Sequence, residues 1–205
     1  MSQTAETFVR QDEGTIVDVF HKWVTRKPGH AALLEKRGAV WQPVTWREFG
    51  KRVAEIAFGL KSLGVGKADR VALFAENRLE WTYADLAILA LGAISVPIYA
   101  TSSADQVSYI LEHSAAKAIF VNTVQDAAKV ARARPTLPHL EKVIIFSAAA
   151  QRESFDLTLE EIYQLGREEQ ASSGARFTDL FADLSLDDLS SIMYTSGTTG
   201  PPKGC

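Results

Sequence analysis

Residues 195–203 combine the groups that a protein uses to bind an anion, directly after an apolar segment. Gly197 and Gly200 let the backbone take positive φ angles and approach a ligand closely, which leaves N–H groups free to converge on an anion. The neighbouring hydroxyls add donors that can rotate, and Lys203 adds a full positive charge. We therefore predict a phosphate-binding loop. Its candidate contact residues are Thr195, Ser196, Gly197, Thr198, Thr199, Gly200 and Lys203.

This loop differs from the Walker A type of phosphate-binding loop. That pattern needs Gly-Lys-Ser/Thr leading directly into a helix, whereas here Pro202 precedes Lys203 and Gly204 follows it. The prolines stiffen the segment, which lowers the cost of ordering it around a triphosphate. The alternative is a flexible glycine and threonine turn at the surface. We favour phosphate binding because strand, glycines, hydroxyls and lysine occur in one order.

Other polar residues give weaker indications of chemistry. Asp187 and Asp188 could hold magnesium, but acidic residues just before a strand more often mark a solvated turn. Cys205 has no base in evidence, so we do not interpret it as a nucleophile. The histidines show no metal-binding spacing with cysteines or carboxylates, so we assign no metal site. They are His21, His30, His113 and His139.

Two aromatic residues are weaker candidates for ligand contact. Trp81 is interpreted as a packing anchor rather than a ligand contact. Tyr99 ends a predicted strand and residues 101–103 follow it, so they could line a pocket, because ligands of α/β proteins tend to bind at the carboxyl ends of strands. Helix capping explains Ser103 more simply.

The composition is that of an ordinary globular protein and excludes several function classes. Of the 205 residues, 46% are hydrophobic and 23% charged, and the net charge of −3 gives no basic field for nucleic acid. The single cysteine allows no intrachain disulfide, so a cytoplasmic protein is the plain interpretation. Residues 1–14 form a polar tail. The most apolar stretch, 86–100, is short and interrupted, so we predict no transmembrane segment.

Apolar spacing predicts alternating helices and strands along most of the chain. Short strand-like runs with little polar alternation, each followed by an amphipathic helix, are typical of a parallel sheet covered on both faces, so the predicted fold class is α/β. Thr45 with Glu48 and Ser103 with Gln106 have the spacing of capping boxes, and Gly64 suits a left-handed helix end. The predicted helices are 15–27, 45–63, 79–91, 103–113, 123–133 and 159–166; the predicted strands are 69–75, 95–99, 117–121, 142–146 and 189–195, with a hairpin over 31–41 and a loop over 167–188.

The loop sequence YTSGTTGPPKG, residues 194–204, resembles the signature of the adenylate-forming (AMP-binding) superfamily, which includes acyl-CoA synthetases, luciferases and peptide-synthetase adenylation domains. Segments 76–81, 84–103 and 106–121 resemble the long-chain fatty acid CoA ligase branch in order and spacing. The resemblance covers about residues 15–205. Eleven ordered positions make it specific, whereas a lone Gly-x-Gly pattern would not.

The resemblance implies a layered, mostly parallel sheet flanked by helices, the N-terminal portion of an acyl-CoA synthetase-like large domain. It implies activation of a long-chain fatty acid with ATP and Mg²⁺ to an acyl-adenylate, which coenzyme A then converts to acyl-CoA. Fatty acid, ATP and CoA would be the small-molecule partners. The matched loop residues would hold the β- and γ-phosphates. Peripheral membrane association is left open.

The resemblance also implies an incomplete AMP-binding domain over 15–205. The family's catalytic lysine and magnesium-binding glutamate are expected beyond residue 205, so the catalytic residues are unknown. Cys205 stands where the family usually has an apolar residue. We expect the chain to be a fragment that is inactive alone. The alternatives are adenylation of an amino, aryl or short-chain acid, or a non-catalytic scaffold fragment.

Overall fold

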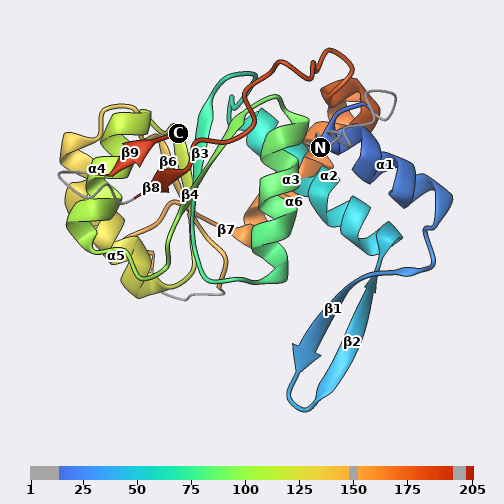
Figure 1. Cartoon of the computed structure of the whole chain (residues 1–205), viewed down its shortest axis with the longest axis horizontal. Helices are drawn as coiled ribbons and strands as arrows, with labels where there is room; N and C mark the ends of the chain where they lie inside the picture. Colours follow the sequence, from blue (N-terminus) through green and yellow to red (C-terminus); the bar gives the residue numbers. More distant parts are fainter. Residues whose placement is uncertain (1–13, 148–151, 196–201) are drawn as a thin grey trace, which may run out of the picture.

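A five-stranded parallel sheet forms the centre of the molecule, with helices on both faces (Figure 1). The computed structural model describes residues 14–147, 152–195 and 202–205. The strand order is β4-β3-β5-β6-β7. This confirms the predicted α/β fold class. The strands are β3 (Arg70–Phe74), β4 (Ile94–Ile98), β5 (Ala118–Val121), β6 (Lys142–Ile145) and β7 (Leu157–Thr158).

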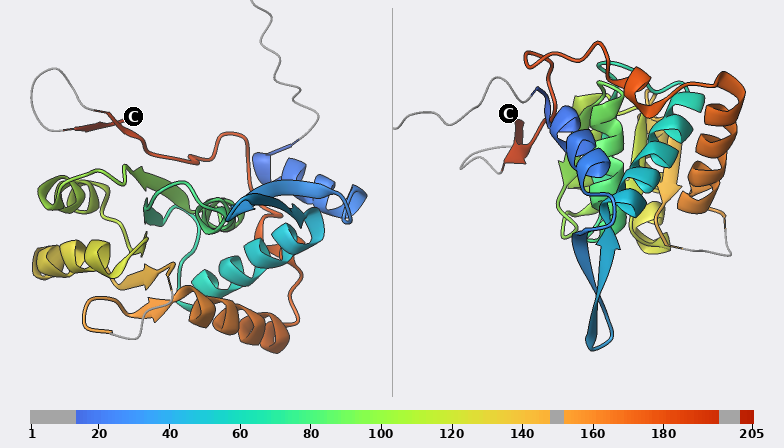
Figure 2. Two further views of the ribbon diagram at one scale, coloured as in Figure 1. Left: turned by 90° about the horizontal axis from the view of Figure 1, so that it is seen from below. Right: turned by 90° about the vertical axis from the view of Figure 1, so that its right-hand side faces the viewer.

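Six α-helices are present in the described part of the chain, and they divide between the two faces of the sheet. One face carries α4 and α5, and the other carries α2, α3 and α6, with α1 packed outside them (Figures 1 and 2). Among the described residues, no helix combines the length and the apolar character that crossing a membrane requires. The helices are α1 (Ile16–Arg26), α2 (Trp46–Ser62), α3 (Leu79–Ala90), α4 (Ala104–Ser114), α5 (Val124–Ala133) and α6 (Leu159–Ser173).

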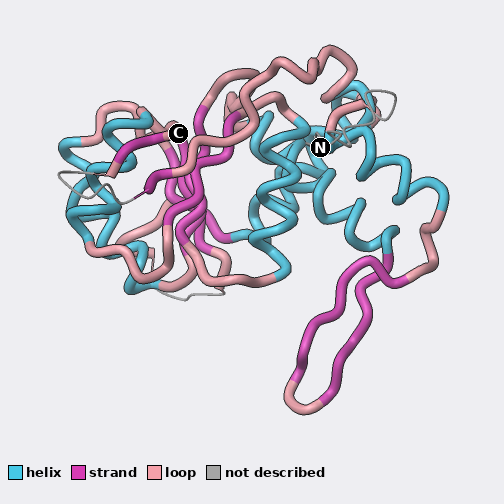
Figure 3. The backbone as a smooth tube through the Cα atoms, in the orientation of Figure 1, coloured by secondary structure: helices cyan, strands magenta, loops and turns pink. Residues whose placement is uncertain are grey.

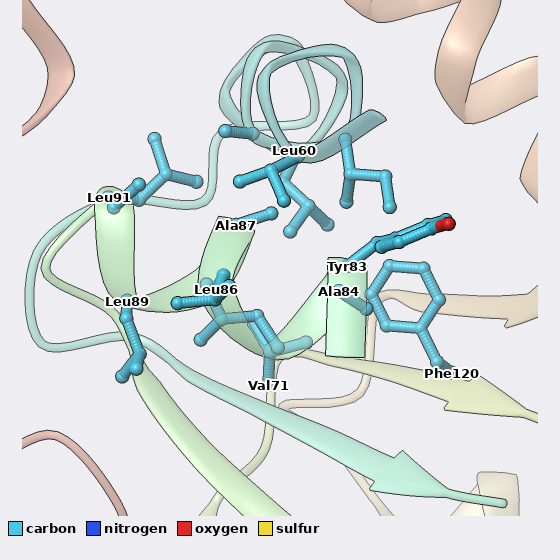
Figure 4. Close-up of a cluster of buried hydrophobic side chains, with 14 of the residues drawn as sticks. Leu60, Val71, Tyr83, Ala84, Leu86, Ala87, Leu89, Leu91 and Phe120 are labelled. Atoms are coloured by element: carbon cyan, nitrogen blue, oxygen red, sulfur yellow. The ribbon is translucent and has the colours of Figure 1, made fainter. Parts of the chain in front are cut away.

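Alternate residues of β3, β5 and β6 enter two separate hydrophobic cores, because successive side chains of a strand point to opposite faces. In β3, Val71 and Leu73 belong to the core under α2, α3 and α6, whereas Ala72 and Phe74 belong to the core under α4 and α5. Figure 4 shows the first core, where Val71 and Phe120 point from the sheet toward Leu60 of α2 and Ala84 and Ala87 of α3. Strands buried on both faces explain why the sequence shows nearly continuous apolar runs.

The helix ends follow the predicted capping chemistry. Thr45 N–H donates to Glu48 Oε2 at 2.9 Å, and Glu48 N–H donates to Thr45 Oγ1 at 3.2 Å. Ser103 and Gln106 form the second predicted capping box. Gly64 has a φ of +82°, as the left-handed end of α2 requires. Both capping boxes and this glycine are therefore confirmed.

A two-stranded hairpin, β1 (Ala31–Arg37) and β2 (Val40–Thr45), projects away from the helices between α1 and α2 (Figure 2). The strands pair antiparallel and Gly38 turns between them with a φ of +63°. The sequence predicted this hairpin with shorter strands. Beyond the apolar runs from which the hairpin was predicted, the charged residues Glu35, Lys36 and Arg37 extend β1, and residues 42–45 extend β2.

The structure differs from the predicted elements in three places: two predictions were wrong in extent, and one strand was not predicted. Helix α6 continues to Ser173, seven residues beyond the predicted end at 166, because its last two turns are polar and carry no apolar period. Strand β7 was missed because it is only two residues long. Segment 189–195 is not one strand: Ser191 forms an isolated parallel bridge with Ser95, and only Tyr194–Thr195 are regular. The connection from α6 crosses one end of the molecule before reaching this segment (Figure 3).

Helices α2 and α6 approach each other so closely that glycine is required at their contact. A Cβ atom on Gly166 would lie 1.8 Å from the backbone oxygen of Glu55, and one on Gly59 would lie 2.4 Å from that of Ile162. Backbone atoms cannot move aside as a flexible side chain can. The two helices therefore pack backbone against backbone.

We predict that Gly166→Ala lowers the free energy of unfolding by about 1–3 kcal/mol, because the added methyl group must push the helices apart. Denaturant unfolding followed by circular dichroism measures this change. Gly29→Ala is the matched control: a Cβ there meets nothing within 4 Å, and its effect should stay within about 0.5 kcal/mol. Equal stability of the two variants would contradict the close helix contact.

A second prediction concerns Asp85 of α3, whose pKa is raised by burial. A raised pKa in the folded state means that ionisation of Asp85 opposes folding. The stability contributed by the protonated Asp85 is therefore present at low pH and is lost as pH rises through the folded pKa. Asp85→Asn should therefore raise the unfolding temperature at about pH 7, and the gain should shrink toward about pH 4. Asp187→Asn, at an exposed turn, is the control. A gain independent of pH would contradict the assignment.

Candidate phosphate-binding site

The two ends of the predicted phosphate-binding loop are joined in a short antiparallel pair, β8 (Tyr194–Thr195) and β9 (Lys203–Gly204). Thr195 pairs with Lys203, and Tyr194 pairs with Gly204. One residue further out, Met193 and Cys205 exchange backbone hydrogen bonds of 3.0 and 2.9 Å. The fold thus brings together two predicted contact residues that are eight positions apart in sequence. The other predicted contacts lie outside the described residues: Ser196, Gly197, Thr198, Thr199 and Gly200.

Thr195 and Lys203 are both exposed to solvent. Within the part of the chain that the structure describes, Lys203 forms no salt bridge. A lysine ammonium is a compact charge on a flexible stem, so it can follow an anion near the end of this pair. The predicted role of these residues in binding phosphate stays a prediction.

Tyr194, the residue just before the predicted loop, packs into the hydrophobic core. Its side chain is only 6% exposed and belongs to the core shared with α4 and α5. Its hydroxyl lies 2.8 Å from Nδ1 of His113, in the last turn of α4. Burial raises the pKa of the Tyr194 hydroxyl, so this group stays neutral and hydrogen-bonded at physiological pH.

The backbone just before Tyr194 lies against the open edge of β4. Ser95 N–H donates to the Ser190 oxygen and Ile192 N–H donates to the Ser95 oxygen, both at 2.9 Å. The hydroxyls of Ser95 and Ser191 are buried there and have no hydrogen-bond partner among the described residues. This junction is thus held by two backbone hydrogen bonds rather than by its side-chain hydroxyls.

A pocket of about 480 Å³ adjoins this segment, at the carboxyl ends of β3 and β4. Such sites outside the carboxyl ends of parallel strands are where open α/β sheets bind ligands. Trp81 packs against the first core and also lines this pocket, as does Tyr99, which is 75% exposed. Glu76 and Asn77 provide polar groups. The predicted pocket position of Tyr99 is thus confirmed, and Ser103 caps α4 instead.

Asp188 is held in a turn. Its Oδ2 accepts hydrogen bonds from Lys67 Nζ at 2.7 Å and from Ser185 N–H at 2.8 Å. The hydrogen bond from Lys67 holds the pKa of Asp188 below its usual range. Asp187 is exposed in the same turn. In the described ranges, no group of three or more His, Cys, Asp or Glu side chains could hold a metal ion.

Sequence reasoning missed the role of His113. The predicted helix over 103–113 places His113 at its end, in agreement with its position in the last turn of α4, but its contact with Tyr194 spans 81 residues. No local pattern relates two residues so far apart. The sequence does indicate the contact between Tyr109 and His113, because ring-bearing residues four apart on a helix lie on one face.

Comparisons with known proteins agree with this architecture. The family model described as AMP-binding enzyme matches residues 20–205. A relative from Mycobacterium bovis, long-chain-fatty-acid–CoA ligase FadD15, is 39% identical over 166 residues, covering 81% of this chain and 26% of the relative. Mouse long-chain-fatty-acid–CoA ligase ACSBG1 is 29% identical over 201 residues, covering 97% of this chain and 27% of the relative.

A solved structure, the anthranilate CoA ligase AuaEII in complex with anthranoyl-AMP, matches with a TM-score of 0.74 and 24% sequence identity. That match covers 92% of this chain and 33% of the solved chain, and it supports the fold. The chain spans about a quarter of the length of the curated relatives, 26% in the first case. Because the family model matches residues 20–205, the chain belongs to the AMP-binding enzyme family.

Proposed function

We propose that this chain is the N-terminal part of an ATP-dependent long-chain fatty acid–CoA ligase, and that residues 195–203 hold the β- and γ-phosphates of ATP. The observation that carries the proposal is the pairing of Thr195 with Lys203, which joins the two ends of the predicted loop beside the carboxyl edge of the sheet. The relatives at 39% and 29% identity, both long-chain-fatty-acid–CoA ligases, support the substrate class.

The chemistry of adenylation explains why such a loop is needed. A carboxylate oxygen of the acid attacks the α-phosphorus of ATP, and the bond to the pyrophosphate oxygen breaks. Negative charge builds on the departing pyrophosphate, and donors fixed in advance around it stabilise the transition state. Lys203 would supply positive charge, and Thr195 and the residues between them would supply hydroxyl and backbone N–H donors.

The remaining reactants are proposed from family membership. The described residues provide no cluster of metal ligands, so we propose Mg²⁺ only as the ion that accompanies ATP. Coenzyme A would take the acyl group from the adenylate through its thiol, and we assign no residue to it. We further propose that the 205-residue chain alone forms no acyl-CoA. A cytoplasmic location and peripheral membrane association stay predictions.

Two other functions are retained as alternatives. The acid could be an amino, aryl or short-chain acid, since the same fold occurs in an anthranilate CoA ligase. The chain could also act as a non-catalytic phosphate-binding scaffold. Titration of the 205-residue chain with ATP addresses the second alternative, because saturable micromolar binding would show that this portion suffices as a binding module.

We predict that Lys203→Ala slows the exchange of labelled pyrophosphate into ATP by about 10²-fold in a full-length enzyme that contains this chain, the usual cost of losing one preorganised donor. The matched control is Lys36→Ala, which removes an exposed lysine from the projecting hairpin and should leave the rate unchanged. An unchanged rate in Lys203→Ala would remove this residue from the mechanism.

The identity of the acid is tested by the same exchange assay with a panel of acids. We predict that long-chain fatty acids stimulate exchange, and that amino, aryl and short-chain acids give at least about tenfold lower kcat/KM, a difference of about 1.4 kcal/mol in transition-state binding. Preference for an aryl or amino acid would replace the long-chain assignment and keep the adenylation chemistry.

A further inference from the structure

His113 of α4 contacts the residue that immediately precedes the predicted loop. Its Nδ1 lies 2.8 Å from the Tyr194 hydroxyl, and the two rings meet edge to face with centroids 5.6 Å apart and an interplanar angle of 88°. Tyr109, one turn earlier on α4, stacks on the imidazole at 5.6 Å and 28°. Two aromatic neighbours and a hydrogen bond therefore fix the orientation of the His113 ring.

Tyr194 is the buried member of its strand segment. Met193 and Thr195, on either side of it, are exposed, whereas Tyr194 is 6% exposed. Because neighbouring side chains of a strand point to opposite sides, the direction of Tyr194 decides the direction of Thr195. A slip of one residue would turn Thr195 inward and the tyrosine outward.

Few other contacts hold this part of the backbone. Strand β8 has two residues, and within the described residues the backbone of 189–195 hydrogen-bonds to the main sheet only at Ser95, while Ile192 packs partly buried against the second core. Its partner β9 is equally short and is exposed along its length. The hydrophobic packing of the tyrosine ring is not directional, whereas the hydrogen bond to His113 sets how deep the hydroxyl lies.

We propose that His113 is a positioning residue for the two ends of the predicted loop: through Tyr194 it fixes β8, and hence the positions of Thr195 and Lys203. The importance of these two positions for phosphate binding rests on the proposed function. The mechanical link, by which His113 holds β8 through Tyr194, does not depend on the proposed function. The ligand group that these two positions would bind is the β,γ-diphosphate portion of a nucleoside triphosphate.

The mechanical link is tested by hydrogen exchange, measured by mass spectrometry on peptides that cover 189–195 in the 205-residue chain. His113→Ala and Tyr194→Phe should each speed exchange in this segment by about fivefold, the effect of losing one hydrogen bond, with exchange in β3 and β5 unchanged. His113→Asn should restore protection, because its amide lies as many bonds from Cβ as Nδ1 does. His139→Ala, an exposed histidine, is the control.

The functional consequence is tested in a full-length enzyme that contains this chain. We expect His113→Ala to lower kcat for pyrophosphate exchange by about fivefold with the KM for the acid unchanged, and His113→Asn to recover most of it. The double variant with Tyr194→Phe should be no slower than either single variant, since both remove one interaction. Additive losses, or no change in local exchange, would overturn the proposal. Failure of Lys203→Ala to slow the reaction, with the exchange result intact, would instead count against the proposed function.

Discussion

Burial of both faces of the parallel sheet is the constraint on which the rest of the structure depends. Strands β3, β5 and β6 send alternate side chains into two cores, so each face needs a helical layer. Helices α3, α4 and α5 come from connections between parallel strands, whereas α2 precedes β3 and α6 follows β7. The layer formed by α2 and α6 meets this requirement with backbone contacts at Gly59 and Gly166, which bring both helices close over the first core. The apolar face of the sheet therefore determines where each helical layer lies.

This arrangement also decides where ligand-binding groups can gather. The strands all run in one direction, so the segments that leave β3 and β4 emerge at the same edge of the sheet and form one pocket there. The last part of the chain returns to that edge and contributes Met193 and Tyr194 to the pocket wall. Parallel topology thus brings the residues just before the predicted loop, Met193 and Tyr194, to this pocket.

The framework and the loop-bearing segment differ in how they are held. Strands β3, β5 and β6 are almost entirely buried, whereas 189–195 meets the sheet at one isolated bridge and packs against the second core through Tyr194 and the partly buried Ile192. A segment held by few directional contacts shifts easily, so losing any one of these contacts has a large effect on its position. The His113–Tyr194 hydrogen bond is such a contact, and it comes from a helix whose own place is set by the second core.

The sequence by itself determined the features whose causes are local: the α/β alternation, the capping boxes at Thr45 and Ser103, the left-handed Gly64, and the anion-binding composition of residues 195–203. It also carried enough of a family signature to indicate adenylate-forming chemistry. Tertiary structure alone decided the length of α6, the breakup of 189–195, the glycine contact between α2 and α6, and the pairing of His113 with Tyr194. These features depend on contacts between residues that are far apart along the chain. Composition and periodicity reflect only the preferences of residues that are close in sequence.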